Sequence, residues 1–166
     1  MSNETFVTHS ALEEELILEI AMAIHQEYNE KRLKEKPDVP LEYSSWDELP
    51  PDIKLSNIEQ AKDIPEKLRL IGCFINHKIS GTPPIIFFEE DEIEVLAIHE
   101  HERWIKERKA SGWIYGKTKD VQKKISPYLA PWDKIPDNIK KYDVETVTNI
   151  IPLLRGVNLY VYRHVS

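Results

Sequence analysis

The sequence predicts a mainly α-helical protein with short, minor β-strands, built from two related repeats that pack together. Three observations support this fold class: apolar residues recur at three- and four-residue steps, proline and glycine divide the chain into segments, and one half of the chain repeats the other. The length of 166 residues suits one ordinary domain or two very small ones that share a core. With 31 % charged and 41 % hydrophobic residues, the composition is that of a soluble globular protein.

The internal repeat is the most informative of these features. The segment WDELPPDIK at residues 46–54 returns as WDKIPDNIK at residues 132–140, an offset of 86. Upstream, an offset of 76 pairs His25 with His101. These matches indicate a tandem duplication or two copies of one family.

We therefore predict a first repeat with its linker over residues 1–84 and a second repeat over residues 85–166. Each half has about 80 residues and would be marginally stable alone. The two repeats are therefore expected to bury apolar faces against each other about a pseudo-two-fold axis.

The first repeat is expected to open with a helix. Apolar residues at helical spacing over residues 12–28 are typical of an amphipathic helix. Ser10 and Glu13 have the spacing of a capping box, which satisfies free amides at a helix start. The prolines at positions 37 and 40 end this element.

A second helical region begins at Pro50, because proline suits the first turn of a helix and little else in it. Pro65 lies inside this region, so we expect a kink or two short helices with an aspartate cap between them. Gly72 is the expected stop. Short strands are expected at residues 73–75 and, after the linker, at 85–88.

The second repeat begins with acidic residues 89–92, which favour the positive end of a helix. The helix that follows is expected to end at Gly112. Residues 113–116 predict a turn, and residues 117–126 predict a short basic helix.

The last helix of the second repeat is expected over residues 137–155, with an interruption near Pro152 and a stop at Gly156. Residues 157–163 alternate in polarity, which is typical of a strand.

Composition excludes several function classes. No apolar run approaches the roughly 20 residues that span a bilayer, and the N-terminus lacks the features of a signal peptide. One cysteine suits a reducing compartment, so a cytoplasmic location is expected. Five glycines leave no Gly-rich phosphate loop, and the net charge of −7 argues against binding long nucleic acid.

The second repeat carries a series of motifs at fixed spacing: HERW at 101–104, SGWIYG at 111–116, DVQK at 120–123, PYL at 127–129 and WDKIP at 132–136. In this series the second repeat resembles the ryanodine-receptor repeat, or RyR domain, whose pattern is HExW, GWxYG, DxxK, PxL and an aromatic-x-x-aliphatic-P step. The first repeat resembles a shorter prokaryotic variant, with HQEY at 25–28 and WDELP at 46–50, but it lacks the GWxYG block.

Within this family, tandem pairs occur at the cytosolic periphery of giant calcium channels. Such a pair can hold an adenine nucleotide in the cleft between its repeats, and prokaryotic members are proposed sensors of nucleotide-derived ligands. The resemblance therefore implies a stand-alone tandem pair of prokaryotic or viral type with a nucleotide-like ligand. Channel activity is not implied, because the chain has no membrane segment.

The aromatic residues are the leading candidates for ligand contact. If the repeats face each other, Tyr28 and Trp104 would converge on one cleft and sandwich a planar base, with Trp113 beside them. The alternative is that aromatic residues at helical spacing belong to the core. For Trp46 and Trp132, the WDxxP context favours a packing anchor.

Two histidines share a helix face with these aromatic residues, since His25 and His101 lie three residues before Tyr28 and Trp104. They could hydrogen-bond a ribose or a phosphate. The alternative for each is a partly buried histidine bonded to a backbone carbonyl.

A basic strip adds a phosphate-binding element, because eight Lys and Arg residues lie between residues 103 and 124. The alternative is a solvated helix face that balances the acidic first half. Catalysis has little support, since only His25, His101 and Glu102 could serve as acid and base. No metal site is expected, because His99 and His101 point to different faces of a helix.

We therefore expect a non-enzymatic protein that binds a nucleotide or nucleotide-derived ligand between its repeats, as a sensor or a sequestering protein, without a cofactor. The alternative is a protein–protein interaction module that binds a peptide or a partner domain. The candidate ligand-binding residues are Tyr28, His25, Trp104, His101, Arg103, Trp113, Tyr115, Lys119, Lys123, Trp46 and Trp132.

Overall fold

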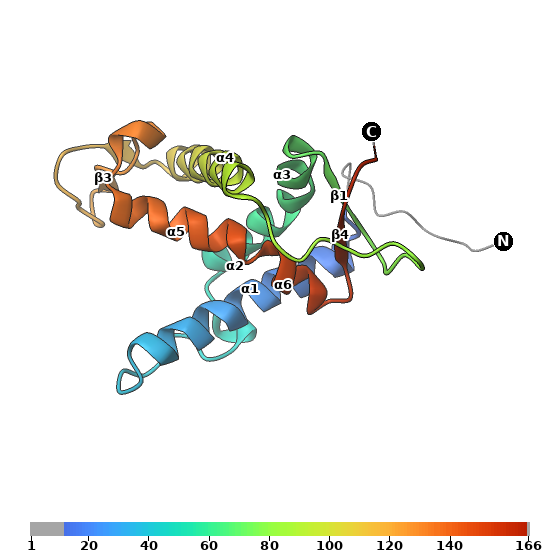
Figure 1. Cartoon of the computed structure of the whole chain (residues 1–166). Helices are drawn as coiled ribbons and strands as arrows, with labels where there is room; N and C mark the ends of the chain where they lie inside the picture. Colours follow the sequence, from blue (N-terminus) through green and yellow to red (C-terminus); the bar gives the residue numbers. More distant parts are fainter. Residues whose placement is uncertain (1–11, 166) are drawn as a thin grey trace. The chain divides into compact units, whose positions relative to one another are not determined.

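A computed structural model of the chain describes residues 12–165 and consists mainly of helices with a few short strands (Figure 1). The prediction of a mainly α fold with minor strands is therefore confirmed. The chain divides into two compact units. Unit 1 comprises the described parts of Met1–Ile86 and Ile151–Ser166, and unit 2 comprises Phe87–Ile150. Among the described residues, none of the helices combines the length and apolar character needed to cross a bilayer.

Unit 1 begins with α1, Glu14–Glu35, which ends before Pro37, the first of the two prolines predicted to end this helix. The predicted cap Ser10 lies outside the described residues. One face of α1 is buried, at Ile20, Ala21, His25 and Asn29. The helical stripe seen in the sequence therefore marks the packed side of this helix.

A 3₁₀ turn, η1 (Trp46–Glu48), leads into α2 (Pro51–Lys62) and α3 (Ile64–Leu70). The two helices are separated by Asp63 at φ −82° and ψ −11°. The expected pair of short helices is thus confirmed, because Pro65 occupies the first turn of α3, where its missing N–H has no acceptor in any case.

A two-stranded antiparallel ribbon joins the end of the chain to unit 1. It pairs β1 (Cys73–Asn76) with β4 (Tyr160–Arg163), and Cys73 lies opposite Arg163. The Phe74 and Tyr162 rings stack across the ribbon with centroids 5.8 Å apart. The strand expected at residues 85–88 is wrong, because this segment makes one ladder-like bond, Ile85 N–H to the Val161 carbonyl at 2.9 Å.

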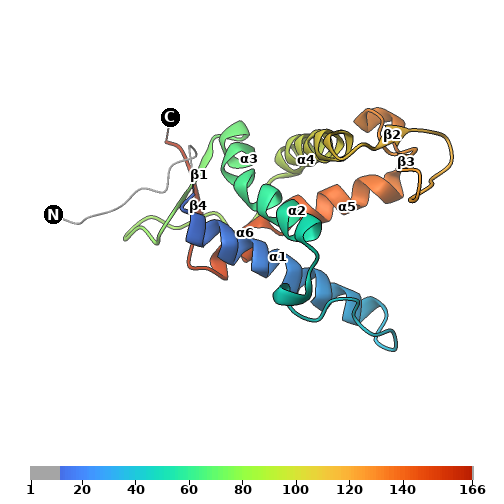
Figure 2. The same cartoon turned by 180° about the vertical axis from the view of Figure 1, so that it is seen from behind.

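Unit 2 is built around α4 (Glu90–Ala110) and α5 (Asp137–Thr148), which lie side by side in both views (Figures 1 and 2). The expected acidic start is present as a capping box between Glu89 and Glu92. Gly112, at φ +91°, follows the end of α4 and reverses the chain, as glycine can at such an angle.

The short basic helix predicted for residues 117–126 is wrong. Residues 114–115 form β2, which pairs in parallel with β3 at residues 125–126. Between the strands the chain turns, because Lys124 takes φ 54° and the Asp120 carboxylate accepts the Lys123 N–H at 3.0 Å. A residue with a left-handed backbone conformation cannot continue a right-handed helix, so the lysine-rich composition of this segment does not make it helical.

The chain after α5 also differs from the prediction. The break before α6 (Ile150–Arg155) falls at Asn149 rather than near Pro152. Pro152 is the third residue of α6, where its backbone nitrogen has no intrahelical acceptor. Like Pro65, it therefore lies within a first turn.

The two sequence repeats share an order of elements: a long helix, a 3₁₀ turn at the tryptophan (η2, Trp132–Lys134, in the second), two shorter helices and a strand. The second repeat adds β2 and β3 between its long helix and its 3₁₀ turn. Asp63 and Asn149, at the offset of 86, have nearly equal backbone angles, −82° and −11° against −86° and −4°. The repeat boundary at residues 84 and 85 stays a prediction, because a compact unit reports packing rather than duplication.

Candidate functional site

A stack of side chains runs along the last turns of α4 in unit 2. The His101 and Trp104 rings lie 6.0 Å apart between centroids and 18° from parallel. The Arg108 guanidinium carbon lies 5.6 Å from the Trp104 ring centre and 5.5 Å from that of Trp113. We call Trp104, Arg108 and Trp113 the Trp–Arg stack.

Local geometry brings these three side chains together. Positions 104 and 108 are neighbours on one helix face. After the turn at Gly112, the Trp113 N–H donates to the Arg108 carbonyl at 3.0 Å, which returns the second indole to the helix end. Cation–π contact then joins the guanidinium to both rings.

Arg108 has an unmet hydrogen-bonding need. Its Nε is buried and has no hydrogen-bond partner among the described residues. An unpaired buried donor costs about 1–3 kcal/mol, so an oxygen acceptor here would be stabilising. Arg108 belongs to the predicted basic strip but was not predicted as a site residue, although its four-residue spacing from Trp104 indicates contact with that ring.

Beside this stack lies the lysine loop, residues 117–124. It is closed by the Ile114 N–H, which donates to the Lys124 carbonyl at 2.9 Å. The side chain of Lys124 donates to the Ser111 carbonyl at 2.8 Å, whereas Lys117, Lys119 and Lys123 are exposed and form no ion pair among the described residues. The loop therefore carries positive charge that the described chain does not neutralise.

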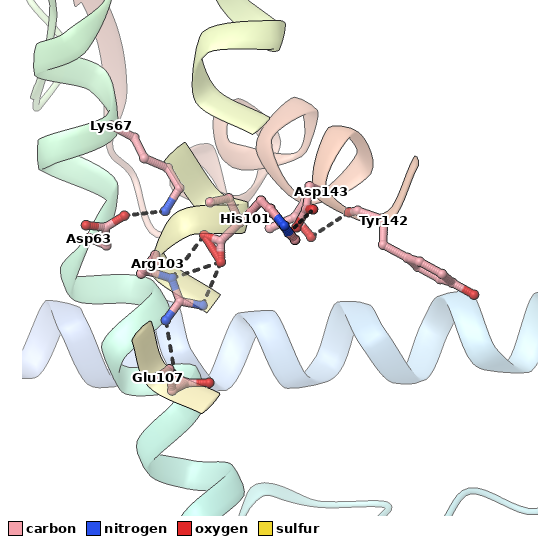
Figure 3. Close-up of polar contacts among 9 residues, drawn as sticks. Asp63, Lys67, His101, Arg103, Glu107, Tyr142 and Asp143 are labelled. Carbon is pink, nitrogen blue, oxygen red and sulfur yellow. Dashed lines mark hydrogen bonds and ion pairs between the residues drawn. The ribbon is translucent and has the colours of Figure 1, made fainter. Parts of the chain in front are cut away.

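Arg103 is held in a different way (Figure 3). Its guanidinium donates to the buried Glu100 at 2.6 and 2.9 Å and to Glu107 at 3.2 Å. Burial lowers the pKa of Arg103, but the hydrogen bonds and charges of Glu100 and Glu107 outweigh it and raise the pKa above its ordinary value. A phosphate at Arg103 would have to compete with two carboxylates.

His101 is buried, with 2 % of its surface exposed. Its Nε2 lies 2.6 Å from the Ala130 carbonyl, which only accepts, so Nε2 carries the proton. Its Nδ1 lies 3.6 Å from the Asp143 carboxylate (Figure 3), and its ring meets Trp132 edge-on at 5.9 Å. His101 therefore matches the alternative to ligand contact predicted from the sequence, a histidine that is buried and bonded to a backbone carbonyl.

His25, the equivalent residue in unit 1, is also buried. Asn29 Nδ2 donates to the Tyr43 carbonyl at 2.9 Å and lies 3.2 Å from His25 Nε2. Because the amide has a second hydrogen to donate, His25 Nε2 is the acceptor here. Tyr28 on the next turn is 65 % exposed.

Trp46 and Trp132 are partly buried, and each has a lysine over its ring. Lys54 Nζ lies 6.0 Å from the Trp46 ring centre, and Lys140 Nζ lies 5.4 Å from that of Trp132. Both lysines follow their tryptophan by eight residues, so the contact recurs in the two repeats.

The structure thus brings Trp104, Trp113 and the lysine loop together within unit 2 and directs Arg103 to Glu100. Tyr115, in β2, is 58 % exposed beside this loop. The convergence of Tyr28 and Trp104 on one cleft stays a prediction, since these residues belong to different units.

Comparison with known families gives one finding. The family model described as RyR domain matches residues 89–163. This range contains α4, the Trp–Arg stack, the lysine loop and α5. The resemblance of the second repeat is therefore confirmed, while the tandem pair and its prokaryotic or viral type stay predictions.

Proposed function

The chain carries an RyR domain over residues 89–163, and from this premise we propose that it binds a nucleotide or a nucleotide-derived small ligand without catalysing a reaction. The Trp–Arg stack carries the proposal. A guanidinium with an unpartnered buried nitrogen contacts two indoles, beside a loop of unneutralised lysines.

The phosphate groups of the ligand would meet the cations. Arg108 would donate from Nε to a phosphate oxygen, and such charge-assisted hydrogen bonds are about twice as strong as neutral ones. Lys119 and Lys123, exposed on the lysine loop, would neutralise the remaining charge. Arg108 takes the phosphate-binding role that the sequence suggested for Arg103.

The base would extend the stack. The Arg108 guanidinium contacts both indoles, so part of each ring is already in contact with a cation. No further ring or cation contacts Trp113 among the described residues, which leaves its indole as the end of the stack. A base added there would contribute about 1–3 kcal/mol, with the exposed Tyr115 nearby.

A binding role suits this cluster better than an enzymatic one. General acid–base catalysis needs a side chain that can exchange a proton with the substrate. The histidine of this cluster, His101, is buried and bonded to Ala130. As a sensor the protein would pass its ligand state to a partner, and as a sequestering protein it would lower the free ligand concentration.

Calorimetric titration with ATP, ADP-ribose, NAD, cyclic mononucleotides and cyclic dinucleotides tests the proposal. Reversing Lys119 and Lys123 to Glu should weaken binding at least about tenfold, which is about 1.4 kcal/mol. The same net charge change at Lys34 and Lys78, exposed in unit 1, should leave the affinity unchanged.

Arg108→Met should also weaken binding of the phosphate-bearing ligands, since it keeps an apolar stem beside the indoles but removes the donor. Two results would overturn the proposal: no binding of any nucleotide tested, or an equal loss of affinity in the Lys119/Lys123 and Lys34/Lys78 charge-reversal variants.

A second candidate function is supported by exposed apolar side chains. Ile114, Tyr115 and Val121 are 58 %, 58 % and 64 % exposed around the same loop. A protein–protein interaction module binding a peptide would use them. Tyr115→Ser with Val121→Ser should then abolish partner binding, whereas charge reversal on the loop should leave it largely intact.

A further inference from the structure

A groove of about 320 Å³ lies on unit 1, between α1 and the connection that leads to η1. We call it the α1 groove. Ligand pockets in proteins begin at about 300 Å³, so it suits a small group rather than a whole dinucleotide. The residues that matter for its chemistry are Met22, Gln26, Glu30, Leu33, Leu41 and Trp46.

Internal hydrogen bonds hold the α1 groove open as a preformed feature. At its base, Asn29 ties α1 to the connection through the Tyr43 carbonyl at 2.9 Å. On the far wall, the Glu48 carboxylate accepts from the Ser44 hydroxyl at 2.9 Å and backbone N–H at 2.7 Å. The lining is thus fixed before any ligand arrives, which lowers the entropy cost of binding.

The charge of the groove is negative. Glu30 is the charged residue among its lining side chains, which include no lysine or arginine. Its carboxylate accepts from Gln26 at 3.3 Å and has no cationic partner among the described residues. Burial, and then the charge of Glu30, raise the pKa of the neighbouring Glu27. A phosphate would be repelled here, and a cation would be attracted.

The shape of the groove favours a flat cation. Trp46 forms one wall, and a guanidinium there would have to displace the Lys54 ammonium, 6.0 Å from the ring centre, or stack on the opposite face of the indole. In unit 2 the histidine ring of His101 contacts the equivalent Trp132, whereas no ring contact joins His25 and Trp46. A guanidinium can stack on an indole and give two parallel hydrogen bonds to a carboxylate at once.

We propose that the α1 groove binds a planar cation, a guanidinium or amidinium group, between the Trp46 ring and the Glu30 carboxylate. An aliphatic stem would lie along Met22, Leu33 and Leu41. Two sources offer this chemistry: a free guanidine, or an arginine side chain of a protein partner. The inference is independent of nucleotide binding, because its groove belongs to unit 1 and excludes phosphate.

Titration of the full chain, followed by ¹H–¹⁵N NMR at the Trp46 indole, tests the inference. The probes are agmatine, a short arginine-containing peptide, and the same peptide with citrulline or lysine in place of arginine. Agmatine and the arginine peptide should bind at least about tenfold more tightly than the neutral citrulline peptide. Equal affinity for agmatine and the arginine peptide identifies a free guanidine as sufficient, and a tighter peptide identifies a protein source.

Matched variants separate this site from nonspecific attraction. Glu30→Gln should weaken arginine binding at least about tenfold, while Glu35→Gln, an exposed change on the same helix, should not. Trp46→Leu should abolish binding and Trp132→Leu should preserve it. Should Trp46→Leu fail to fold, the result for Glu30→Gln, a change at an exposed position, decides the test. Equal binding of citrulline, an unchanged Glu30→Gln, or no shift with either guanidine would overturn the inference.

Discussion

Gly116 makes the closest approach between the strands of unit 2, and its replacement by alanine tests how the lysine loop is held. A β-carbon at position 116 would lie 2.3 Å from Cγ2 of Ile125. Ile125 is β-branched and lies in β3, so its methyl group cannot swing aside as the end of a flexible chain can. Gly116 does not have a positive φ, so the obstacle is the contact rather than the backbone.

The magnitude follows from two opposing terms. Overpacking of this kind costs about 1–3 kcal/mol. Replacing glycine by alanine also restricts the unfolded chain, which returns about 0.4–1 kcal/mol. The net loss of unfolding free energy should therefore lie between about 0 and 2.6 kcal/mol, with a midpoint of about 1.3 kcal/mol. Opening the β2–β3 pair relieves the contact, so a smaller loss must be accompanied by faster amide exchange at Ile114 and Ile125.

Urea unfolding and hydrogen exchange together measure this effect. Ile125→Leu removes the branched Cγ2 and should restore most of the stability lost in Gly116→Ala, which a double-mutant cycle would report as coupling. Opening of the loop should also weaken any ligand bound by Lys119 and Lys123. Normal stability together with normal exchange in Gly116→Ala, or no rescue by Ile125→Leu, would refute the reasoning.

Three further predictions concern buried polar groups. Arg103→Met should lower the unfolding free energy by about 3–5 kcal/mol, because the buried Glu100 carboxylate loses the guanidinium that donates to both of its oxygens. In urea unfolding, the exposed Arg69→Met should barely change the midpoint, and equal effects would contradict this role. Asn29→Ala should lower the unfolding free energy by about 1–3 kcal/mol, because it leaves the Tyr43 carbonyl without its Asn29 donor. Amide hydrogen exchange in residues 36–46 should become faster, and unchanged exchange would count against this role. Glu27→Gln should raise the melting temperature at pH 7, because the raised pKa of Glu27 means that ionisation opposes folding. The stabilising effect of protonating Glu27 is complete below pH 4.5 and is lost as the pH rises through the raised pKa of the folded protein. The difference in melting temperature between Glu27→Gln and the unchanged protein should therefore vanish in acid. A difference that stays constant across the pH range would argue against this role.

Proline placement shows what the sequence could predict and where its interpretation needs care. Pro65 and Pro152 both lie in the first turn of a short helix, and the break precedes each of them. The prediction succeeded at Pro65, where the cap was sought before the proline. It failed at Pro152, where the break was expected near the proline itself, although the same rule places it at Asn149.

The lysine loop shows what local sequence could not predict. Lysine and glutamine favour helices, and residues 117–126 contain no proline or glycine to break one. The outcome depends on pairing with β2 and on the left-handed Lys124, both of which are set by the packed structure. Contacts distant in sequence override local propensity here, so the lysines predicted on a helix lie instead on a loop between two short strands.

The choice between Arg103 and Arg108 depended on helix geometry. Arg103 lies between Glu100 and Glu107 at three- and four-residue spacing, so the sequence already offered it two carboxylates on one face. Arg108 lies four residues after Trp104 and has no carboxylate to neutralise it among the described residues. A count of charges treats Arg103 and Arg108 as equal. The residues three and four positions away on the helix distinguish Arg103, which is paired with carboxylates, from Arg108, which is not.

The two equivalent histidines extend the same reasoning to the repeats. His101 donates from Nε2 to the Ala130 carbonyl, whereas His25 accepts at Nε2 from Asn29, which donates in turn to the Tyr43 carbonyl. Their proton positions are opposite: His101 itself ties its long helix to the segment before the 3₁₀ tryptophan, whereas His25 does so only through Asn29 on the same helix. A shared ligand contact would require the same donor in both repeats, and a shared structural tie does not. The equivalent histidine positions are therefore explained by packing, and the two proposals rest instead on features that belong to one unit each, the Trp–Arg stack in unit 2 and the α1 groove in unit 1.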